Sequence, residues 1–106
     1  MVAMNAITEF CQRIVDRFGV QRIILFGSYA KGVATSDSDV DLLIVMPFEG
    51  RSVDESVKIR LVLKPAFPVD LIVRTSDYIH RRIQQGDTFL RDIMENGKVI
   101  YAADHD

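Results

Sequence analysis

Apolar positions near the start of the chain recur every three to four residues, the spacing of one helix face. They are Ile7, Phe10, Cys11, Ile14, Val15 and Phe18. Charged side chains occupy the intervening positions, so the segment is predicted to be an amphipathic helix. Gly19 is expected to end it, since glycine is a common helix C-terminal residue.

Short runs rich in Val, Ile and Leu predict the strands of a sheet. They lie at residues 22–26, 40–46 and 69–73, with a last short strand at 98–102. The run at 40–46 is continuous and closed by Pro47, which suits a strand covered on both faces. We also expect 69–73 to be buried.

Helical patterns separate these runs. One or two turns are predicted at 28–33, a helix at 53–64 before Pro65, a helix capped by Ser76-Asp77 that runs to Gln85, and a helix from Asp87 or Thr88 to Gly97. Residues 103–106 are expected to fray. Alternating helices and apolar strands predict an α/β (α+β) fold in which helices flank a mixed β-sheet. The length of 106 residues suits one domain over 1–106.

Composition narrows the function classes. The formal net charge of −2 gives no hint of the basic face that phosphate-backbone binding needs, so a nucleic-acid partner is not expected. The apolar runs fall short of the roughly 20 residues of a membrane span. One cysteine cannot form an internal disulfide, and the N-terminus lacks a signal-peptide pattern. We therefore expect a cytoplasmic protein without a membrane partner.

The segment from Gly27 to Asp41 nearly fits two known motifs and fails both. Gly27 and Gly32 have P-loop spacing, but Val33 stands where that motif requires lysine. Asp37, Asp39 and Asp41 imitate the start of an EF-hand loop, but Leu42 and Phe48 occupy the positions of its glycine and its bidentate glutamate. Neither motif explains the segment.

What remains is a pair of carboxylates at the start of an apolar strand. Strand side chains alternate, so Asp39 and Asp41 share one face, about 7 Å apart along the backbone. Two such acids repel each other unless a cation lies between them, and Mg²⁺ prefers oxygen ligands. The alternative is a solvated acidic turn.

Asp70 is a third acid, inside the predicted strand 69–73. A buried carboxylate must be paired, protonated or bound to a metal. An ion pair with Arg74 is one alternative. If the two strands are neighbours, Asp70 joins Asp39 and Asp41 in the carboxylate arrangement typical of two-metal phosphoryl transfer.

Gly27 and Ser28 follow a strand and open a predicted helical turn, where free N–H groups can bind a phosphate. A tight turn with Ser28 as N-cap is the compatible structural interpretation. Lys31 is placed to reach a triphosphate, although a solvated charge explains it as well. Cys11 lies on the apolar face of the first predicted helix and is interpreted as a core residue, and His80 and His105 have no partners at metal-ligand spacing.

Gly27-Ser28, ten intervening residues and then Asp39-Val40-Asp41 resemble the signature of the DNA polymerase beta-like nucleotidyltransferases. Asp70 matches the third acid of that family. The longer strings 27–32 and 38–42, with the segment 79–101, are similar to the minimal nucleotidyltransferases of bacteria and archaea.

This resemblance implies the polymerase beta-like fold and a site of defined chemistry. Gly27, Ser28 and Lys31 would hold the phosphates of ATP or another nucleoside triphosphate. Asp39, Asp41 and Asp70 would bind two Mg²⁺ ions and act as the catalytic residues. A nucleoside monophosphate would pass to an acceptor hydroxyl.

The family also implies a partner. Its short members are often encoded beside a HEPN-type protein, to which they attach AMP as antitoxins. The first hypothesis is therefore an adenylyltransferase acting on such a protein. The alternative is a non-catalytic module that neutralises or scaffolds the HEPN protein by contact, and homo- or hetero-oligomers fit either hypothesis. The acceptor and the preferred nucleotide are open at this point.

Overall fold

The structure is a computed structural model that describes residues 1–103; of the tail expected to fray, 103–106, residues 104–106 lie outside the described residues. In chain order the elements are α1 (Met4–Arg17), β1 (Arg22–Phe26), α2 (Gly27–Lys31), β2 (Val40–Val45), α3 (Ser52–Leu63), β3 (Val69–Arg74), α4 (Ser76–Gln84), α5 (Thr88–Asn96) and β4 (Lys98–Ala102).

The strands form one mixed sheet in the order β3-β2-β1-β4. β1 is antiparallel to β2 and to β4, whereas β2 and β3 are parallel. Parallel neighbours need a crossover, and α3 supplies it between β2 and β3. The predicted mixed sheet flanked by helices is confirmed.

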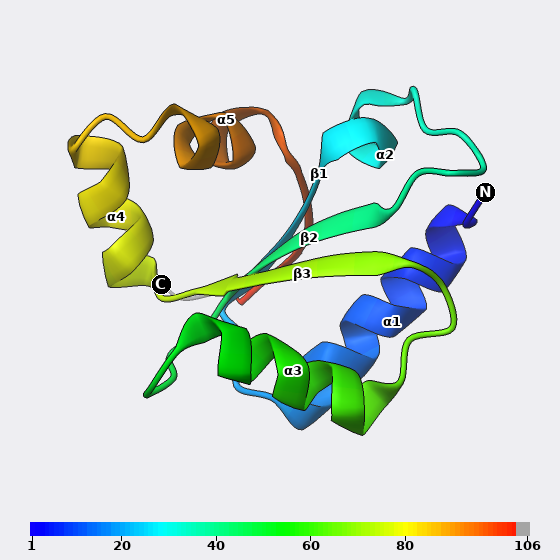
Figure 1. The fold of residues 1–106 in the computed structure, drawn as a ribbon, viewed down its shortest axis with the longest axis horizontal. Coiled ribbons are helices and arrows are strands. Elements are labelled where there is room, and N and C mark those ends of the chain that lie inside the picture. Colours follow the sequence, from blue (N-terminus) through cyan, green and yellow to red (C-terminus); the bar gives the residue numbers. More distant parts are fainter. Residues whose placement is uncertain (104–106) are drawn as a thin grey trace.

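Helices cover the sheet on both faces. Figure 1 shows α1 and α3 on one side of the strands and α4 and α5 on the other. Alternate residues of β2 serve the two sides: Leu42 and Ile44 join the core beneath α1 and α3, and Leu43 and Val45 join the core beneath α4 and α5. The expectation that β2 is covered on both faces is confirmed, because every residue of it except Asp41 is buried.

β3 departs from its prediction. It is an edge strand whose exposure alternates, rather than a strand buried on both faces. An edge strand has a neighbour on one side only, and the second residue of β3, Asp70, is exposed. The run 69–73 is apolar because Val69, Leu71 and Val73 pack into the core with α1 and α3.

Several predicted helix ends are also corrected. α1 ends at Arg17 with Phe18 as C-cap, and Gly19 does not take the positive φ that such a stop requires. Thr75, rather than Ser76-Asp77, caps α4, since its hydroxyl accepts the backbone N–H of Tyr78 at 3.1 Å. At α5 one of the two predicted caps is confirmed, since the carboxylate of Asp87 accepts from Leu90 N at 2.9 Å.

The C-terminal end of the described chain is held to the sheet. Ala103 donates its backbone N–H to Gln21 O at 2.8 Å, so the predicted fraying does not begin at Ala103. Within residues 1–103, no helix combines the length and the apolar character needed to cross a membrane.

Candidate active site

Two of the three predicted acids come from neighbouring strands and share one face of the sheet. Asp41 on β2 and Asp70 on β3 are partners in the parallel register. Each alternates with residues that point into the core under α1 and α3, so both side chains lie on the opposite face, with Leu43 and Ile72. Asp39 lies two residues before Asp41. The prediction of adjacent strands and a shared face is confirmed for Asp41 and Asp70, whereas Asp39 precedes β2 and lies in no strand, so its place on that face stays a prediction.

Gly27 lies directly beneath one of these acids. β1 pairs with β2 so that Phe26 faces Asp41, and Gly27 follows with φ of +74°. A Cβ atom at Gly27 would collide with Asp41 Oδ2 and lie 3.1 Å from its Cγ. Only glycine allows both the left-handed turn and this close approach.

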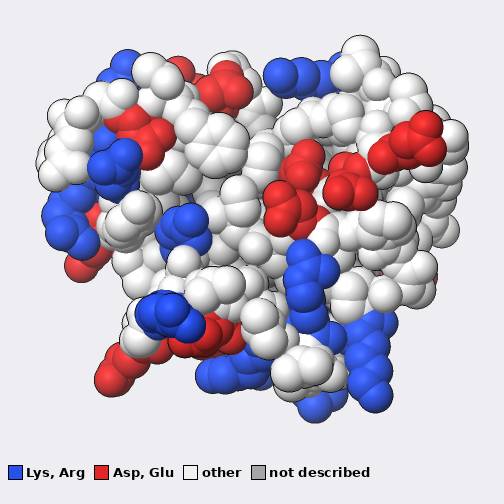
Figure 2. All heavy atoms as spheres, in the orientation of Figure 1, with Lys and Arg blue, Asp and Glu red and all other residues white. Residues whose placement is uncertain are grey.

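The electrostatics of the site reflect like charges held together. Burial raises the pKa of the Asp41 carboxyl, and the nearby charges of Asp70 and Asp39 raise it further. No ion pair or side-chain hydrogen bond within residues 1–103 involves any of the three carboxylates. Figure 2 shows acidic side chains gathered on the surface near the start of β2. The arrangement concentrates negative charge without a protein cation to balance it.

Asp70 itself is exposed, so the argument from a buried carboxylate is wrong. It lies second on an edge strand, where water reaches the side chain. The alternative of an ion pair with Arg74 is also wrong. The Arg74 guanidinium donates to Val73 O at 2.9 Å and lies 5.7 Å from the centroid of the Tyr78 ring.

The predicted phosphate-binding residues sit on α2, immediately after β1. Ser28 is in the first turn and is not the N-cap, because the helix begins at Gly27 with Phe26 preceding it. Lys31 is exposed in the last turn, before Gly32 at φ of +74°. The structure thus places Gly27 against Asp41 and leaves Lys31 open to solvent. The roles of Ser28 and Lys31 in nucleotide binding stay predictions.

The donor set fits a hard divalent cation. Carboxylate oxygens that repel each other and lack a basic partner gain from such an ion. Within residues 1–103 no three His, Cys, Asp or Glu side chains lie close enough together to ligate one ion. Mg²⁺ characteristically takes one or two carboxylates and fills its shell with substrate phosphates and water. A preformed group of three is therefore not required.

The remaining sequence candidates have structural roles or no partners. Burial raises the pKa of the Cys11 thiol to about 12, which removes it as a nucleophile at neutral pH. His80 is exposed on α4 and belongs to no metal-ligating group among the described residues. His105 lies outside those residues.

Known proteins agree with this geometry. Residues 5–100 match the nucleotidyltransferase domain family. The chain belongs to that family. Its relatives include MJ0604 of Methanocaldococcus jannaschii, named as a protein adenylyltransferase, with 34% identity over 92% of this chain and 96% of that protein. The protein adenylyltransferase MntA of Thermococcus cleftensis is 47% identical over 38% of this chain and 40% of its own length.

Solved structures agree on the fold. A chain from the crystal structure of a toxin–antitoxin with AMP-PNP superposes with a TM-score of 0.53 and 19% identity, over 96% of this nucleotidyltransferase and 75% of that chain. At that identity the likeness supports the fold alone. The predicted membership of the nucleotidyltransferases, and with it an enzyme fold, is confirmed.

The structure also reveals a feature that sequence reasoning missed. A cavity of about 270 Å³ adjoins Asp70 and extends along β3 to Arg74, with Ser52, Ser56 and Arg60 of α3 on its other wall. Arg60 donates to Val69 O, next to Asp70. Nothing in the sequence marks Arg60, because its place depends on how the crossover helix packs against β3.

Proposed function

We propose that this nucleotidyltransferase is a Mg²⁺-dependent protein adenylyltransferase that transfers AMP from ATP to a hydroxyl group on a HEPN-type partner protein, as an antitoxin. The observation that carries the proposal is the convergence of Asp41, Asp70 and Gly27. Asp41 on β2 packs against Gly27 and pairs in register with Asp70 on the neighbouring strand β3. The name of the relative MJ0604, which this chain matches over nearly its whole length, supports a protein acceptor.

Each residue of the site has its own role in one displacement reaction at the α-phosphorus of ATP. The acceptor oxygen attacks the α-phosphorus of ATP, the bond to the β-phosphate oxygen breaks, and pyrophosphate leaves. Gly27 lets the triphosphate approach the backbone closely, with Ser28 and Lys31 beside it. Asp70, the most exposed strand acid, lies where an acceptor can approach, and its carboxylate accepts the hydroxyl proton. Two Mg²⁺ ions held by Asp39, Asp41 and Asp70 would neutralise charge on the phosphates and on the leaving group.

A protein acceptor suits what the chain offers. The elements after β3 finish the sheet and cover part of one face, and a small-molecule acceptor would need an enclosing wall. The net charge of −2 disfavours a free polynucleotide. A protein brings its own wall and positions its own hydroxyl.

The direct test is transfer of label from ATP. The chain is incubated with α-labelled ATP, Mg²⁺ and the product of the neighbouring gene as candidate acceptor, and the mass of the acceptor is measured by mass spectrometry. We expect the mass of one or more AMP groups on the acceptor, absent when Mg²⁺ is chelated and absent in Asp39→Asn. An acceptor that binds tightly and stays unmodified would replace this proposal with the non-catalytic binding module.

ATP binding gives a second readout that needs no acceptor. Three uncompensated carboxylates repel a triphosphate until cations intervene, so ATP should bind with Mg²⁺ and bind poorly without it. Titration calorimetry in both conditions measures the difference. Equal affinities would count against the proposed site.

A further inference from the structure

Two arginines, Arg60 and Arg74, bind backbone carbonyls on the outer edge of β3. Pro68 O and Arg74 O accept from Val40 N and Met46 N of β2 and its extension. In a parallel ladder the N–H and C=O of one residue point the same way, so Val69, Leu71 and Val73 point theirs outward. The side chain of Arg60 donates to Val69 O, and that of Arg74 donates to Val73 O. Another strand therefore cannot add freely to this edge.

These arginines line a groove that begins at the candidate active site. The cavity beside Asp70 runs between α3 and β3 to Arg74. A second cavity of about 310 Å³ shares Ser52 and Arg74 with it and adds Tyr78 and Arg81. The two cavities adjoin at Ser52 and Arg74, and we call them together the α3–β3 groove. Asp70 lies at one end of the groove, and Arg74 and Arg81 lie toward the other.

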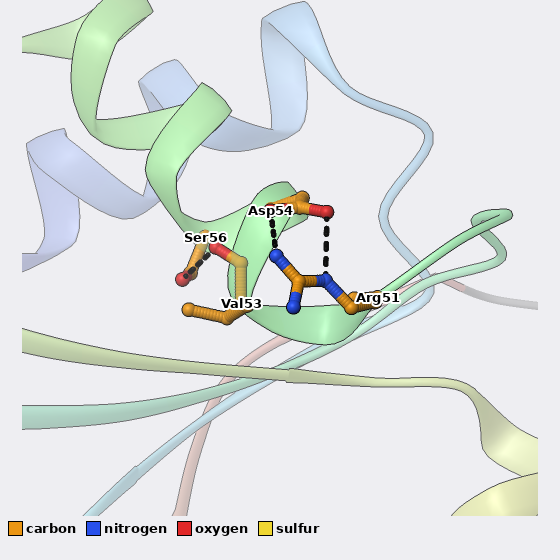
Figure 3. A network of polar contacts seen from close by, with 4 residues as sticks. All are labelled: Arg51, Val53, Asp54 and Ser56. Carbon is orange, nitrogen blue, oxygen red and sulfur yellow. Dashed lines mark hydrogen bonds and ion pairs between the residues drawn. The ribbon is translucent and has the colours of Figure 1, made fainter.

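The cationic groups of the groove are available to a ligand. Each guanidinium has five N–H donors, and Arg60 and Arg74 each use one on a backbone carbonyl. Neither forms an ion pair with a carboxylate within residues 1–103. At the start of α3, Asp54 pairs with Arg51, whose Nε lies 3.2 Å from Asp54 Oδ2 (Figure 3), and Asp70 is the acid that lines the cavity with the two arginines. Figure 3 also shows the Ser56 hydroxyl bonded to Val53 O.

Apolar side chains flank the same groove on the outer side of α3. Val53, Val57 and Leu61 follow one another at i, i+4 spacing and are 54%, 46% and 69% exposed. Val53 also lines the cavity beside Asp70. Apolar stripes beside a basic groove suit a protein surface, whereas a nucleic acid would present phosphates and no matching apolar contact. Figure 2 shows Lys and Arg side chains over α3, close to the acidic cluster.

We propose that the α3–β3 groove is the docking surface for the acceptor protein, with the apolar stripe of α3 as anchor and with Arg60 and Arg74 each as a receptor for a separate carboxylate of that protein. The proposal rests on the proposed function and adds the surface and the chemistry by which the acceptor is recognised. A strand rises about 3.3 Å per residue, so the carbonyls that the two arginines bind, Val69 O and Val73 O, are roughly 13 Å apart along β3. A carboxylate bound at Arg74 therefore holds the acceptor about four strand residues from Asp70.

Binding is measured between the full chain and the product of the neighbouring gene, as candidate acceptor, without nucleotide, by biolayer interferometry. The variants are Val57→Glu and Arg74→Gln. Val99→Glu is the matched control for the first, since Val99 is 52% exposed on β4 at the opposite sheet edge. Arg91→Gln controls the second, since Arg91 on α5 also donates to a backbone carbonyl, that of Ile83.

We expect Val57→Glu and Arg74→Gln to weaken binding roughly tenfold or more, and the two controls to change it less than about twofold. In the transfer reaction both groove variants should raise the KM for the acceptor and leave kcat unchanged. Val57→Lys should bind better than Val57→Glu, because a partner carboxylate attracts it.

The outcomes separate the two proposals. Groove-dependent binding without AMP transfer by the wild-type chain would refute the adenylyltransferase and keep the docking surface. Transfer with an unchanged KM in both groove variants would overturn the docking surface and keep the enzyme. A wild-type chain that does not bind this acceptor would also overturn the docking surface. So would poly(A) RNA that competes with the acceptor for the wild-type chain and loses affinity in Arg74→Gln, because the groove would then bind RNA.

Discussion

The two faces of the sheet are built from the same strands and do different work. On one face β2 contributes Val40, Leu42 and Ile44, all with no exposed surface, to a core that α1 and α3 close. On the other face β2 contributes Leu43 and Val45 to a smaller core, and there the strand begins with a carboxylate, Asp41, that is only partly buried. The β2 side chains on the first face are all fully buried, whereas on the second face Asp41 stays partly exposed.

The difference teaches where this fold can carry unfavourable charge. Adjacent acids cost stability, since burial and two like charges raise the pKa of Asp41. The continuous core on the opposite face supplies stability that does not depend on them. The start of β2 on the second face, around Asp41, can therefore hold charged groups that contribute only when a ligand binds. Substitutions on neighbouring residues of β2 should separate the two roles.

The largest effect is expected from Asp41→Asn. Nucleotidyl transfer should fall on the order of 100-fold or more, because one carboxylate that stabilises the charges of the transition state is lost. The free energy of unfolding should stay equal or rise, since one of three repelling charges is removed. Labelled AMP transfer and chemical denaturation measure the two quantities. A variant that unfolds would assign Asp41 a structural role instead.

Leu42→Ala, the next residue along β2, should do the reverse. Its side chain is fully buried on the α1 and α3 face, so truncation should cost about 2–5 kcal/mol of unfolding free energy. At a temperature where the variant is folded, ATP binding should be unchanged. Urea denaturation and calorimetry test this. A loss of ATP affinity larger than the loss of folded protein would show that the two faces are coupled.

Much of this contrast could be predicted from the sequence. Period-two alternation around Val40 places Asp39 and Asp41 on one face, and the apolar run after them marks a central strand. The mistaken burial of Asp70 has a physical origin. An apolar run reports how well one face packs, and nothing in 69–73 shows that its strand lies at the edge. Sheet order depends on long-range pairing, which local pattern does not encode.

The groove beside Asp70 lay beyond sequence reasoning for the same reason. Arg60 looks like any solvated charge on a helix until α3 is packed against β3 and its guanidinium meets Val69 O. Caps were misplaced by single residues, as with Thr75 and Ser76, because Ser, Thr and Asp all cap helices well and three such residues stand together. The residue types at 75–77 predict that α4 has an N-cap, but they do not determine that Thr75 provides it.

A pair of glycines sharpens the comparison at the boundary of the site. Gly27 and Gly32 both have φ of +74°, but only Gly27 has Asp41 within reach of an added Cβ. Gly32→Ala should cost about 1–2 kcal/mol of unfolding free energy from backbone strain alone. Gly27→Ala should cost about 1 kcal/mol or more beyond that, since Asp41 must shift, and it should also weaken ATP binding. Equal losses in both variants would mean that the approach to Asp41 is unimportant.

The smallest effect is a pH dependence whose sign differs between two aspartates. The folded-state pKa of Asp41 is raised, so in the window just above its ordinary 3.8 the folded protein holds more protons than the unfolded one. The free energy of unfolding contributed by Asp41 therefore falls as pH rises through that window. The pKa of Asp87 is lowered, chiefly by the backbone N–H of Leu90 at the start of α5. Its contribution is present above 3.8 and is lost as pH falls through the lowered value.

Difference melts isolate the two aspartates from every other titrating group. From about pH 3 to pH 7, without Mg²⁺, the Tm of Asp41→Asn relative to wild type should rise with pH, and that of Asp87→Asn should fall. The first slope reports like charges gathered for a ligand, and the second reports a carboxylate that serves only the fold. Slopes of the same sign would show that Asp41 is stabilised by its surroundings, and the contrast between the charged end of β2 and the rest of the molecule would be lost.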